Sequence, residues 1–255
     1  MGLPVFLADF GGDLPAAGAR VTVDGPEAKH MSVRRLAAGA EVLLVDGEDR
    51  RARARIVLSD GPSRVECEVL ESGVVPRPAP HVTVVQAIPK SDRAELAVDL
   101  MTEAGVDAIV PWAARNCVAK WTGAKAGKAR AKWASAAREA AKQARRAWIP
   151  PVAELHATGQ VVELVRDVVG RGGVAAVLHE EETRPFAEVA RAAADSGAGE
   201  IVFIVGPEGG VDDAEVAAFR DAGATAVVLG PTVLRTALAG AAATAALGPL
   251  TGRWG

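Results

Sequence analysis

The chain has 255 residues, a formal net charge of −3 and 49% hydrophobic residues, with a mean hydropathy of +0.16. This composition supplies enough apolar material for one large or two small packed domains and excludes a disordered chain. Its two cysteines, Cys67 and Cys117, are too few for a disulfide framework, and its four histidines never fall at metal-ligand spacing. We therefore expect a reducing compartment and no metal site.

The sequence carries no recognisable targeting or membrane segment. The N-terminus lacks a basic region followed by an uninterrupted apolar stretch. The longest apolar run, Thr236 to Leu250, is short for a membrane span and consists mainly of Ala and Gly. These features predict a cytoplasmic protein with no membrane partner.

The first part of the chain is predicted to form a small β-barrel or sandwich. Short β-like runs are separated by turn signals such as Asp24-Gly25-Pro26 and Asp46-Gly47. These runs are Arg20 to Val23, Val42 to Val45, Ala52 to Leu58 and Val65 to Leu70. One amphipathic helix is expected from Glu27 to Leu36, and it carries Arg34 and Arg35 near its end.

Three arginines of the third run, Arg51, Arg53 and Arg55, alternate with apolar residues. In a strand this spacing places all three on one face. The face is either a solvated outer surface or an RNA contact, and the sequence leaves both interpretations open.

A proline-rich segment, Pro76 to Pro80, is the predicted boundary between two domains. After it, buried strands alternate with helices, which predicts a parallel, three-layer α/β domain. The expected strands are Val82 to Ile88, Ile109 to Trp112 and Val174 to Leu178, and the expected helices are Ala94 to Ala104, Lys128 to Ala147 and Val161 to Val169. In the first of these helices, Leu96, Leu100 and Ala104 form the predicted apolar face, with Ala97 and Met101 beside them.

Positive charge is concentrated between Arg115 and Arg146. This segment holds ten Lys and Arg residues against one acid, Glu139, whereas the rest of the chain carries 19 basic and 31 acidic residues. A basic run of this kind is either a solvated helix face or a site for the phosphate backbone of a nucleic acid. Its concentration in an otherwise acidic chain is the pattern expected of a nucleic-acid site.

The C-terminal part repeats one pattern: a buried strand, a glycine loop and a helix. Ile201 to Val205 runs into Gly206 to Gly210, and Ala226 to Leu229 runs into Gly230 to Thr236, which opens a helix of small residues. Glycine after a buried strand lets the backbone approach a ligand closely. Neither loop has the ending of a Walker A motif or the spacing of a dinucleotide-binding loop, which disfavours a phosphate-binding enzyme of the doubly wound type.

The segments Ile204 to Gly210 (IVGPEGG) and Leu229 to Thr236 (LGPTVLRT) resemble the C-terminal motifs of the SPOUT superfamily, and within it the bacterial 16S rRNA (uracil-N3)-methyltransferase family. Gln86 to Arg93 (QAIPKSDR) and Arg138 to Arg146 (REAAKQARR) fit the same family, so the resemblance covers nearly the whole chain. The family usually reads L-R-T-E-T-A where this chain has Leu234 to Ala239 (LRTALA). No role that rests on the family's glutamate or second threonine is carried over.

The resemblance implies an α/β fold of two domains. Residues 1–75 would form a PUA-like RNA-binding β-barrel, and residues 76–255 would form a SPOUT methyltransferase domain with a deep C-terminal trefoil knot. It also implies a homodimer, with the small-residue helix after Arg235 near the interface.

The cofactor implied by the resemblance is S-adenosylmethionine, which the family binds in loops at three strand ends. Rigid loops that expose backbone groups suit this purpose, and His179 is expected in the pocket wall and not as a base. The expected cofactor-binding residues are Leu178, His179, Glu180, Val205, Gly206, Pro207, Gly209, Gly210, Leu229, Gly230, Val233, Leu234, Thr236 and Ala239.

The implied reaction, methylation of uracil N3, needs removal of the imide proton and stabilisation of the resulting negative charge. Arg235 is the catalytic candidate for the second need, because a hydrogen bond to a charged group contributes about 1.5 to 3 kcal/mol. Glu208 is the candidate for orienting or removing the proton. The alternative for Glu208 is a charge that interacts with a helix dipole.

The implied substrate is 16S rRNA, either free or within the 30S subunit. The expected RNA-binding residues are Arg34, Arg35, Lys90, Arg93, Arg115, Arg138, Arg145 and Arg146. Two alternatives stay open: a different SPOUT specificity such as 2′-O-ribose methylation, and an RNA-binding assembly factor without catalytic activity.

Overall fold

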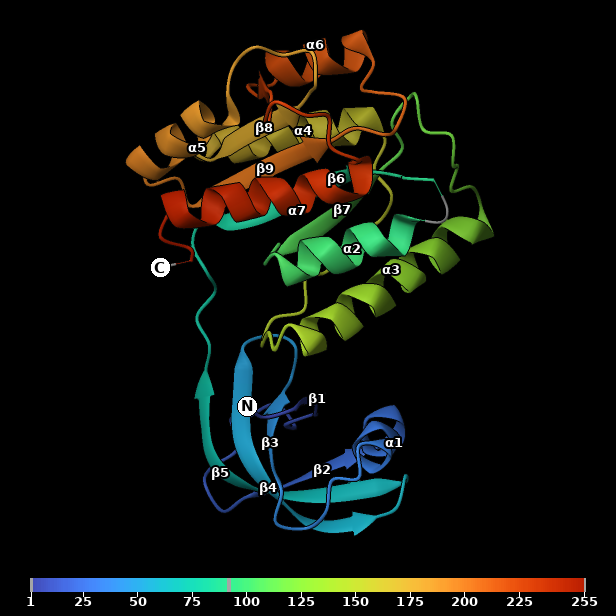
Figure 1. The fold of residues 1–255 in the computed structure, drawn as a ribbon, viewed down its shortest axis with the longest axis vertical. Coiled ribbons are helices and arrows are strands. Elements are labelled where there is room, and N and C mark those ends of the chain that lie inside the picture. Colours follow the sequence, from blue (N-terminus) through green and yellow to red (C-terminus); the bar gives the residue numbers. More distant parts are fainter. Residues whose placement is uncertain (1, 91–92, 255) are drawn as a thin grey trace. The chain divides into compact units, whose positions relative to one another are not determined.

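The structure is a computed structural model that describes residues 2–90 and 93–254 and divides into two compact units (Figure 1). Unit 1 comprises Met1–Arg77 and Ala141–Ile149, and unit 2 comprises Pro78–Ala140 and Pro150–Gly255. The segment Ala141–Ile149 therefore packs with the N-terminal residues, although it follows the proline-rich segment in the sequence. Ser91 and Asp92 of the QAIPKSDR motif lie outside the described residues.

Unit 1 contains a five-stranded sheet in the order β1-β3-β4-β5-β2, in which only the β1–β3 pair is parallel. Its elements are β1 (Val5–Leu7), β2 (Arg20–Asp24), α1 (Gly25–Val33), β3 (Glu41–Val45), β4 (Arg50–Asp60) and β5 (Arg64–Val74). Alternation in β4 directs Ala52, Ala54 and Ile56 into a core that also holds Phe6. The four predicted strands are confirmed. The predicted end of the helix at Leu36 is wrong. Helix α1 ends at Val33, and the backbone of Arg35, two residues later, is left-handed (φ 55°).

The outward face of β4 is occupied by ion pairs. Arg53 donates from Nη1 to Glu41 Oε2 (2.9 Å) and from Nε to Glu71 Oε1 (3.0 Å), and Arg55 Nη2 donates to Glu41 Oε1 (3.3 Å). The hydrogen-bonded Arg53 guanidinium lowers the pKa of both glutamates. The charges of Arg53 and Arg55 are thus balanced within the sheet, which favours a solvated outer surface over an RNA contact at these two positions.

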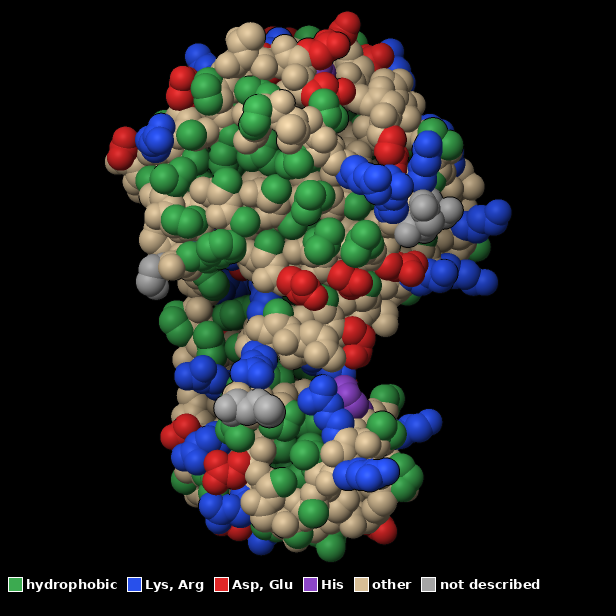
Figure 2. Space-filling view, in the orientation of Figure 1, with side chains coloured by type: hydrophobic (Ala, Val, Ile, Leu, Met, Phe, Trp, Pro, Cys, Tyr) green, Lys and Arg blue, Asp and Glu red, His purple; other side chains and the backbone are tan. Residues whose placement is uncertain are grey.

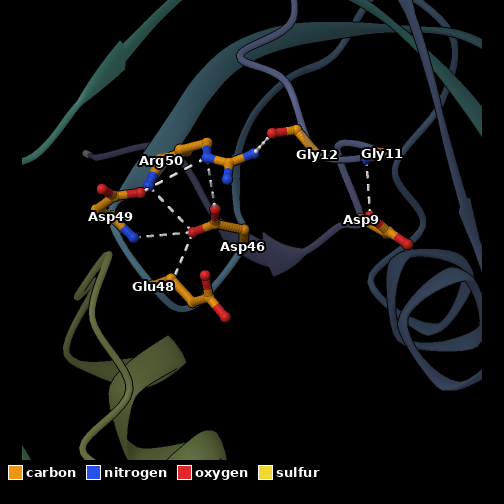
Figure 3. A network of polar contacts seen from close by, with 7 residues as sticks. All are labelled: Asp9, Gly11, Gly12, Asp46, Glu48, Asp49 and Arg50. Atoms are coloured by element: carbon orange, nitrogen blue, oxygen red, sulfur yellow. Dashed lines mark hydrogen bonds and ion pairs between the residues drawn. The ribbon is translucent and has the colours of Figure 1, made fainter.

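Asp46 holds the turn between β3 and β4 (Figure 3). Its Oδ1 accepts hydrogen bonds from the backbone N–H groups of Glu48 (2.8 Å), Asp49 (3.1 Å) and Arg50 (3.0 Å). The Arg50 guanidinium in turn donates to the carbonyl oxygen of Gly12 (2.7 Å). One carboxylate therefore satisfies three backbone donors that the turn would otherwise leave to water.

The segment Ala141–Ile149 is fastened to unit 1 by polar contacts. Lys142 Nζ lies 2.6 Å from Glu27 Oε1, and the two side chains are only 5% and 16% exposed. Trp148 Nε1 donates to the carbonyl oxygen of Val75 (3.0 Å). A buried ion pair and a hydrogen bond thus join two parts of the chain that are distant in sequence.

Unit 2 is built on a five-stranded, all-parallel sheet in the order β10-β8-β9-β6-β7. Its elements are β6 (His81–Ala87), α2 (Ala94–Glu103), β7 (Ala108–Trp112), α3 (Ala124–Gln143), α4 (Thr158–Gly170), β8 (Val174–Leu178), α5 (Phe186–Asp195), β9 (Glu200–Val205), α6 (Asp213–Asp221), β10 (Thr225–Val227), α7 (Thr236–Leu247) and a 3₁₀ turn, η2 (Gly248–Leu250). The last three residues of α3 belong to unit 1. No helix in the described part of the chain is both long and apolar enough to cross a bilayer.

Helices cover both faces of this sheet, so the predicted three-layer arrangement is confirmed. Residues of α2, α5 and α7 share one core with the sheet, and residues of α4 and α6 share the other. The strands were recognisable from their apolar runs, because a parallel sheet covered on both faces is buried throughout. Helix α5 was not predicted, and α6 was expected only as an unbounded helix after Gly210.

Two details of the predicted helices are wrong. In α2 the buried positions are Ala97, Val98, Met101 and Thr102, whereas Leu96 is 48% exposed. Helix α3 runs from Ala124 to Gln143 and not from Lys128 to Ala147, because the chain turns out of the helix where Arg145 adopts φ 56°.

The small residues of α7 allow a close approach to neighbouring elements, as expected from the sequence. A Cβ atom at Gly240 would lie 3.0 Å from both Met101 Sδ and Val84 Cγ1. A larger side chain at this position would push α7 away from α2 and β6. Helix α7 therefore packs close to α2 and β6, and its first residue, Thr236, contacts the loop that follows β9.

Candidate active site

Three loops of unit 2 follow neighbouring parallel strands. They span residues 179–185 after β8, 206–212 after β9 and 228–235 after β10. The carboxyl ends of parallel strands lie at the same edge of a sheet, where open α/β folds bind their ligands. The candidate site is therefore at this edge.

Two adjoining hollows of about 110 and 250 Å³ lie among these loops. The first lies against the end of β8 and residues 228–234, and the second lies against residues 205–208, 210–211 and 233–236. The hollows adjoin, because the same five residues line both: Leu178, Glu180, Val233, Leu234 and Ala239.

Thirteen of the fourteen residues expected to bind a cofactor line these hollows. The exception is Gly209, where an added Cβ would meet Asn116 at 3.3 Å. The sequence did not single out four further lining residues, which are Val211, Val228, Pro231 and Thr232. The roles of all these residues stay predictions.

Glycine is required at two points of the loop after β9. A Cβ at Gly206 would lie 2.6 Å from Val211 Cγ2, and Gly210 has a φ of 74°, which side chains rarely tolerate. Thr236 Oγ1 donates to the carbonyl oxygen of Gly206 (2.8 Å) and so ties the start of α7 to this loop. The lining backbone is therefore held in place before any ligand arrives.

Four charged side chains border the second hollow: Arg93, Glu180, Glu208 and Arg235. Glu208 is exposed, and its Oε1 accepts the backbone N–H of Lys90 (3.1 Å). Helix α6 begins only at Asp213, so Glu208 lies outside its first turn, and the helix-dipole interpretation of Glu208 is disfavoured.

Arg235 is the N-cap residue of α7 and its side chain is exposed. Its backbone belongs to the loop that lines both hollows, while its guanidinium is available to a second ligand. Arg93, expected to contact RNA, borders the same hollow at the start of α2. Cationic side chains from two elements therefore border the second hollow.

The glycine loop is supported from behind by the loop that follows β7. Asn116 Nδ2 donates to the carbonyl oxygens of Gly209 (3.3 Å) and Gly210 (3.2 Å). This support could not be predicted from the sequence, because Asn116 belongs to no motif and lies more than ninety residues away in the chain.

A buried carboxylate anchors this supporting loop. Glu215 is 5% exposed, and its Oε1 accepts the backbone N–H of Arg115 (3.0 Å) and the hydroxyl of Thr158 (2.7 Å). Thr158 in turn accepts a hydrogen bond from Trp112 Nε1 (3.2 Å). The chain of contacts fixes the loop after β7 to the first turn of α6.

The residues expected to bind RNA are spread over both units. Unit 1 holds Arg34, Arg35, Arg145 and Arg146, and unit 2 holds Lys90, Arg93, Arg115 and Arg138. Arg115 Nη1 lies 3.4 Å from Asp212 Oδ1, so part of its charge is balanced. Their binding to RNA stays a prediction.

Within residues 2–90 and 93–254, no group of three His, Cys, Asp or Glu side chains could hold a metal ion. Both cysteines are buried, and burial raises the pKa of Cys67 to about 11 and also raises that of Cys117. Both thiols are therefore protonated at neutral pH.

Comparison with known proteins agrees with this geometry. Residues 76–248 match a family model described as an RNA methyltransferase domain, and residues 23–70 match an RNA methyltransferase PUA domain. The chain is 48% identical to the ribosomal RNA small subunit methyltransferase E of Mycobacterium bovis, over 94% of this chain and 90% of that protein. The chain belongs to the ribosomal RNA small subunit methyltransferase E family.

Two further members of the methyltransferase E family match at lower identity. The Bacillus subtilis protein of the same name is 29% identical over 84% of each chain. The crystal structure of the Neisseria gonorrhoeae protein, bound to S-adenosyl methionine, superposes with a TM-score of 0.84 at 26% identity and covers 98% of both chains.

Membership of the methyltransferase E family confirms the predicted enzyme class and the predicted fold class, a PUA-like unit followed by a SPOUT-type α/β unit. The trefoil knot and the domain boundaries at residues 75 and 76 stay predictions.

Proposed function

We propose that this protein transfers a methyl group from S-adenosylmethionine to N3 of one uridine in 16S rRNA. One observation carries the proposal: the two adjoining hollows on the glycine loops are lined by thirteen residues expected from the uracil-N3 family, with Arg235 and Glu208 at their border. The Neisseria gonorrhoeae relative, similar over 98% of both chains, binds this cofactor.

The residues of the hollow fit the cofactor. The absence of a Cβ at Gly206 and Gly210 keeps the backbone accessible, and the apolar side chains of Leu178, Val233 and Leu234 can cover an adenine ring. When bound, the cofactor supplies a methyl group activated by a positive sulfonium. Glu180, which borders both hollows, places a negative charge where the cationic methionine part can be held.

Arg235 and Glu208 would act on the substrate base. Uracil must leave its stack before N3 can reach the site. The Arg235 guanidinium can then donate hydrogen bonds to O2 or O4, where negative charge develops when the imide proton is lost. Glu208 can accept that proton or orient the N–H group, because its carboxylate borders the same hollow.

We also propose that the enzyme acts in the cytoplasm as a homodimer. Exposed apolar side chains occur on the elements that bear the site: Leu96 is 48% exposed, Leu238 42% and Val233 76%. Figure 2 shows hydrophobic side chains gathered over α2 and α7. Such a patch supports association with a second copy, and sedimentation of the purified protein measures it.

Nucleoside mass spectrometry of 16S rRNA from a deletion strain tests the proposed reaction. We expect 3-methyluridine to be lost, to return fully with the wild-type gene and to return to a lesser extent with Arg235→Ala. Loss of a ribose-methylated nucleoside would instead favour a 2′-O specificity. Absence of S-adenosylmethionine binding in calorimetry would favour an assembly factor without catalytic activity.

The form of the substrate is tested separately. Purified enzyme is given either free 16S rRNA or 30S subunits from the deletion strain, each with labelled S-adenosylmethionine. We expect the label to enter both free 16S rRNA and 30S subunits if the target uridine is exposed in both substrates. If folding of the rRNA decides access to the uridine, the label should enter only one of the two substrates.

A further inference from the structure

A hollow of about 390 Å³ lies wholly within unit 1, apart from the candidate active site. Its walls come from the residues around β1, the end of α1 and the turn after α3. Four of its lining side chains are cationic or titratable nitrogen bases: His30, Arg34, Lys142 and Arg145. Its described lining includes no acidic side chain. Figure 2 shows Lys, Arg and His side chains gathered over α1.

Two of these charges are available to a ligand. Lys142 is balanced by Glu27 at 2.6 Å and forms part of the buried floor. Arg34 and Arg145 are exposed, and neither has an acidic partner in the described part of the chain. The hollow therefore presents two uncompensated guanidinium groups, the side chains best suited to bind phosphate in a forked geometry.

His30 is held in a defined position beside them. Its ring meets the fully buried Phe6 edge to face, with the ring centres 5.5 Å apart. The imidazole can therefore offer a further N–H donor without first losing conformational freedom.

The backbone is strained beside this hollow. Among the described residues, Arg35 (φ 55°) and Arg145 (φ 56°) are the two positions other than glycine with a positive φ. Each follows the end of a helix, α1 or α3, at a place where glycine is the usual residue. A side chain there is unfavourable, and such strain persists mainly where a particular side chain is needed.

The first residues of the chain leave room for Arg145. A methyl group at Gly2 would overlap the Arg145 guanidinium, so glycine at this position lets the arginine reach across to the residues around β1. The positive φ of Arg145 and the absence of a side chain at Gly2 together allow the Arg145 guanidinium to lie in the hollow.

We propose that this hollow binds one phosphate of the RNA backbone, held by Arg34 and Arg145 with His30 as an additional donor. The proposal rests on the proposed function, since the phosphate belongs to the 16S rRNA substrate. A simpler explanation also exists: a cation after the end of a helix interacts favourably with the helix dipole. The two explanations differ in what happens when Arg145 becomes glycine.

The test uses the full-length enzyme with Arg145→Gly. Glycine relieves the strained φ, so thermal unfolding should occur at the same or a higher temperature, and S-adenosylmethionine affinity should not change. Binding of 16S rRNA transcribed in vitro should weaken, and the slope of log affinity against log salt should fall by roughly 0.7 to 0.9, as expected for one lost phosphate contact.

Two further variants keep the test decisive. Arg34→Ala changes an exposed side chain at the end of α1 and should reduce the salt slope in the same way. Arg20→Ala removes an equal charge from β2, where Arg20 lies 3.7 Å from Glu68, and should leave the slope unchanged. Wild-type RNA affinity and salt slope in both Arg145→Gly and Arg34→Ala would overturn the phosphate site and leave Arg145 as a helix cap.

Failure of the proposed function would look different. A wild-type enzyme that binds 16S rRNA but neither binds S-adenosylmethionine nor transfers a methyl group would refute the reaction. The salt slopes of the arginine variants would still decide whether the hollow holds a phosphate.

Discussion

Arg235 and Glu208 border the same hollow, but their attachments differ. Arg235 caps α7, and its carbonyl oxygen accepts backbone hydrogen bonds from Leu238 (2.8 Å) and Ala239 (3.1 Å). Glu208 instead uses a carboxylate oxygen to hold the backbone of Lys90. The Arg235 side chain is therefore free for substrate, whereas the Glu208 side chain has a structural contact as well.

For Arg235→Ala we expect the single-turnover rate of methyl transfer to fall by one to a few powers of ten, because about 1.4 kcal/mol of transition-state stabilisation corresponds to tenfold. S-adenosylmethionine affinity should change little, since the loop backbone is retained. Rapid-quench kinetics and calorimetry measure the two quantities. A variant that no longer binds the cofactor would show that Arg235 is a cofactor residue.

For Glu208→Gln we expect a slower single turnover whose deficit shrinks at high pH, where hydroxide can remove the imide proton. The amide oxygen of Gln can still accept the Lys90 N–H, so the loop contact is a built-in control. A normal rate at neutral pH would assign Glu208 to holding the loop and not to proton transfer.

At the scale of elements, the site depends on loops that carry no motif. Asn116→Ala removes two hydrogen bonds to the carbonyl oxygens of Gly209 and Gly210, each worth about 0.5 to 1.5 kcal/mol. We expect S-adenosylmethionine to bind roughly fivefold to a hundredfold more weakly. Lys120→Ala, an exposed change in the same loop, is the control and should bind normally in calorimetry. If the two variants bind S-adenosylmethionine with equal affinity, Asn116 does not support the site.

The turn held by Asp46 makes a prediction for unit 1. Asp46→Ala leaves three backbone N–H groups without their shared acceptor and should destabilise this unit by about 1 to 3 kcal/mol. Asp46→Asn keeps one acceptor oxygen and should cost less. Hydrogen exchange of β3 and β4 reports the change, while protection of the parallel sheet of unit 2 should persist. Unchanged protection of the turn in Asp46→Ala would refute the role assigned to it.

At the scale of the whole molecule, what could be predicted was local. Apolar runs bounded by Gly and Pro located the parallel strands, and the glycine loops after β9 and β10 located the site. The contacts that could not be predicted from the sequence join distant parts of the chain. Neither the packing of Ala141–Ile149 with unit 1 nor the support of Gly209 by Asn116 leaves a periodic signal.

The C-terminus supplies a further long-range contact, beyond residue 248 where the family match ends. Arg253 Nη2 lies 2.8 Å from Asp107 Oδ2, and the side chains are only 2% and 7% exposed. The same guanidinium donates to the carbonyl oxygen of Gly105, and Asp107 Oδ2 also accepts the backbone N–H of Val82 (2.9 Å). The last residues of the chain are thereby fastened to the first strand of unit 2.

Arg253→Ala removes the guanidinium that balances the buried carboxylate of Asp107. Breaking a buried ion pair from one side typically costs about 3 to 5 kcal/mol, because the remaining charge stays in a poorly solvated position. We expect a loss of this size in the unfolding free energy of unit 2, measured by denaturant titration. Combining Arg253→Met with Asp107→Leu should recover part of it, since neither charge is then buried. If Arg253→Ala unfolds like the wild type, the C-terminal contact contributes nothing, and the fold of unit 2 is complete at the residues matched by the family.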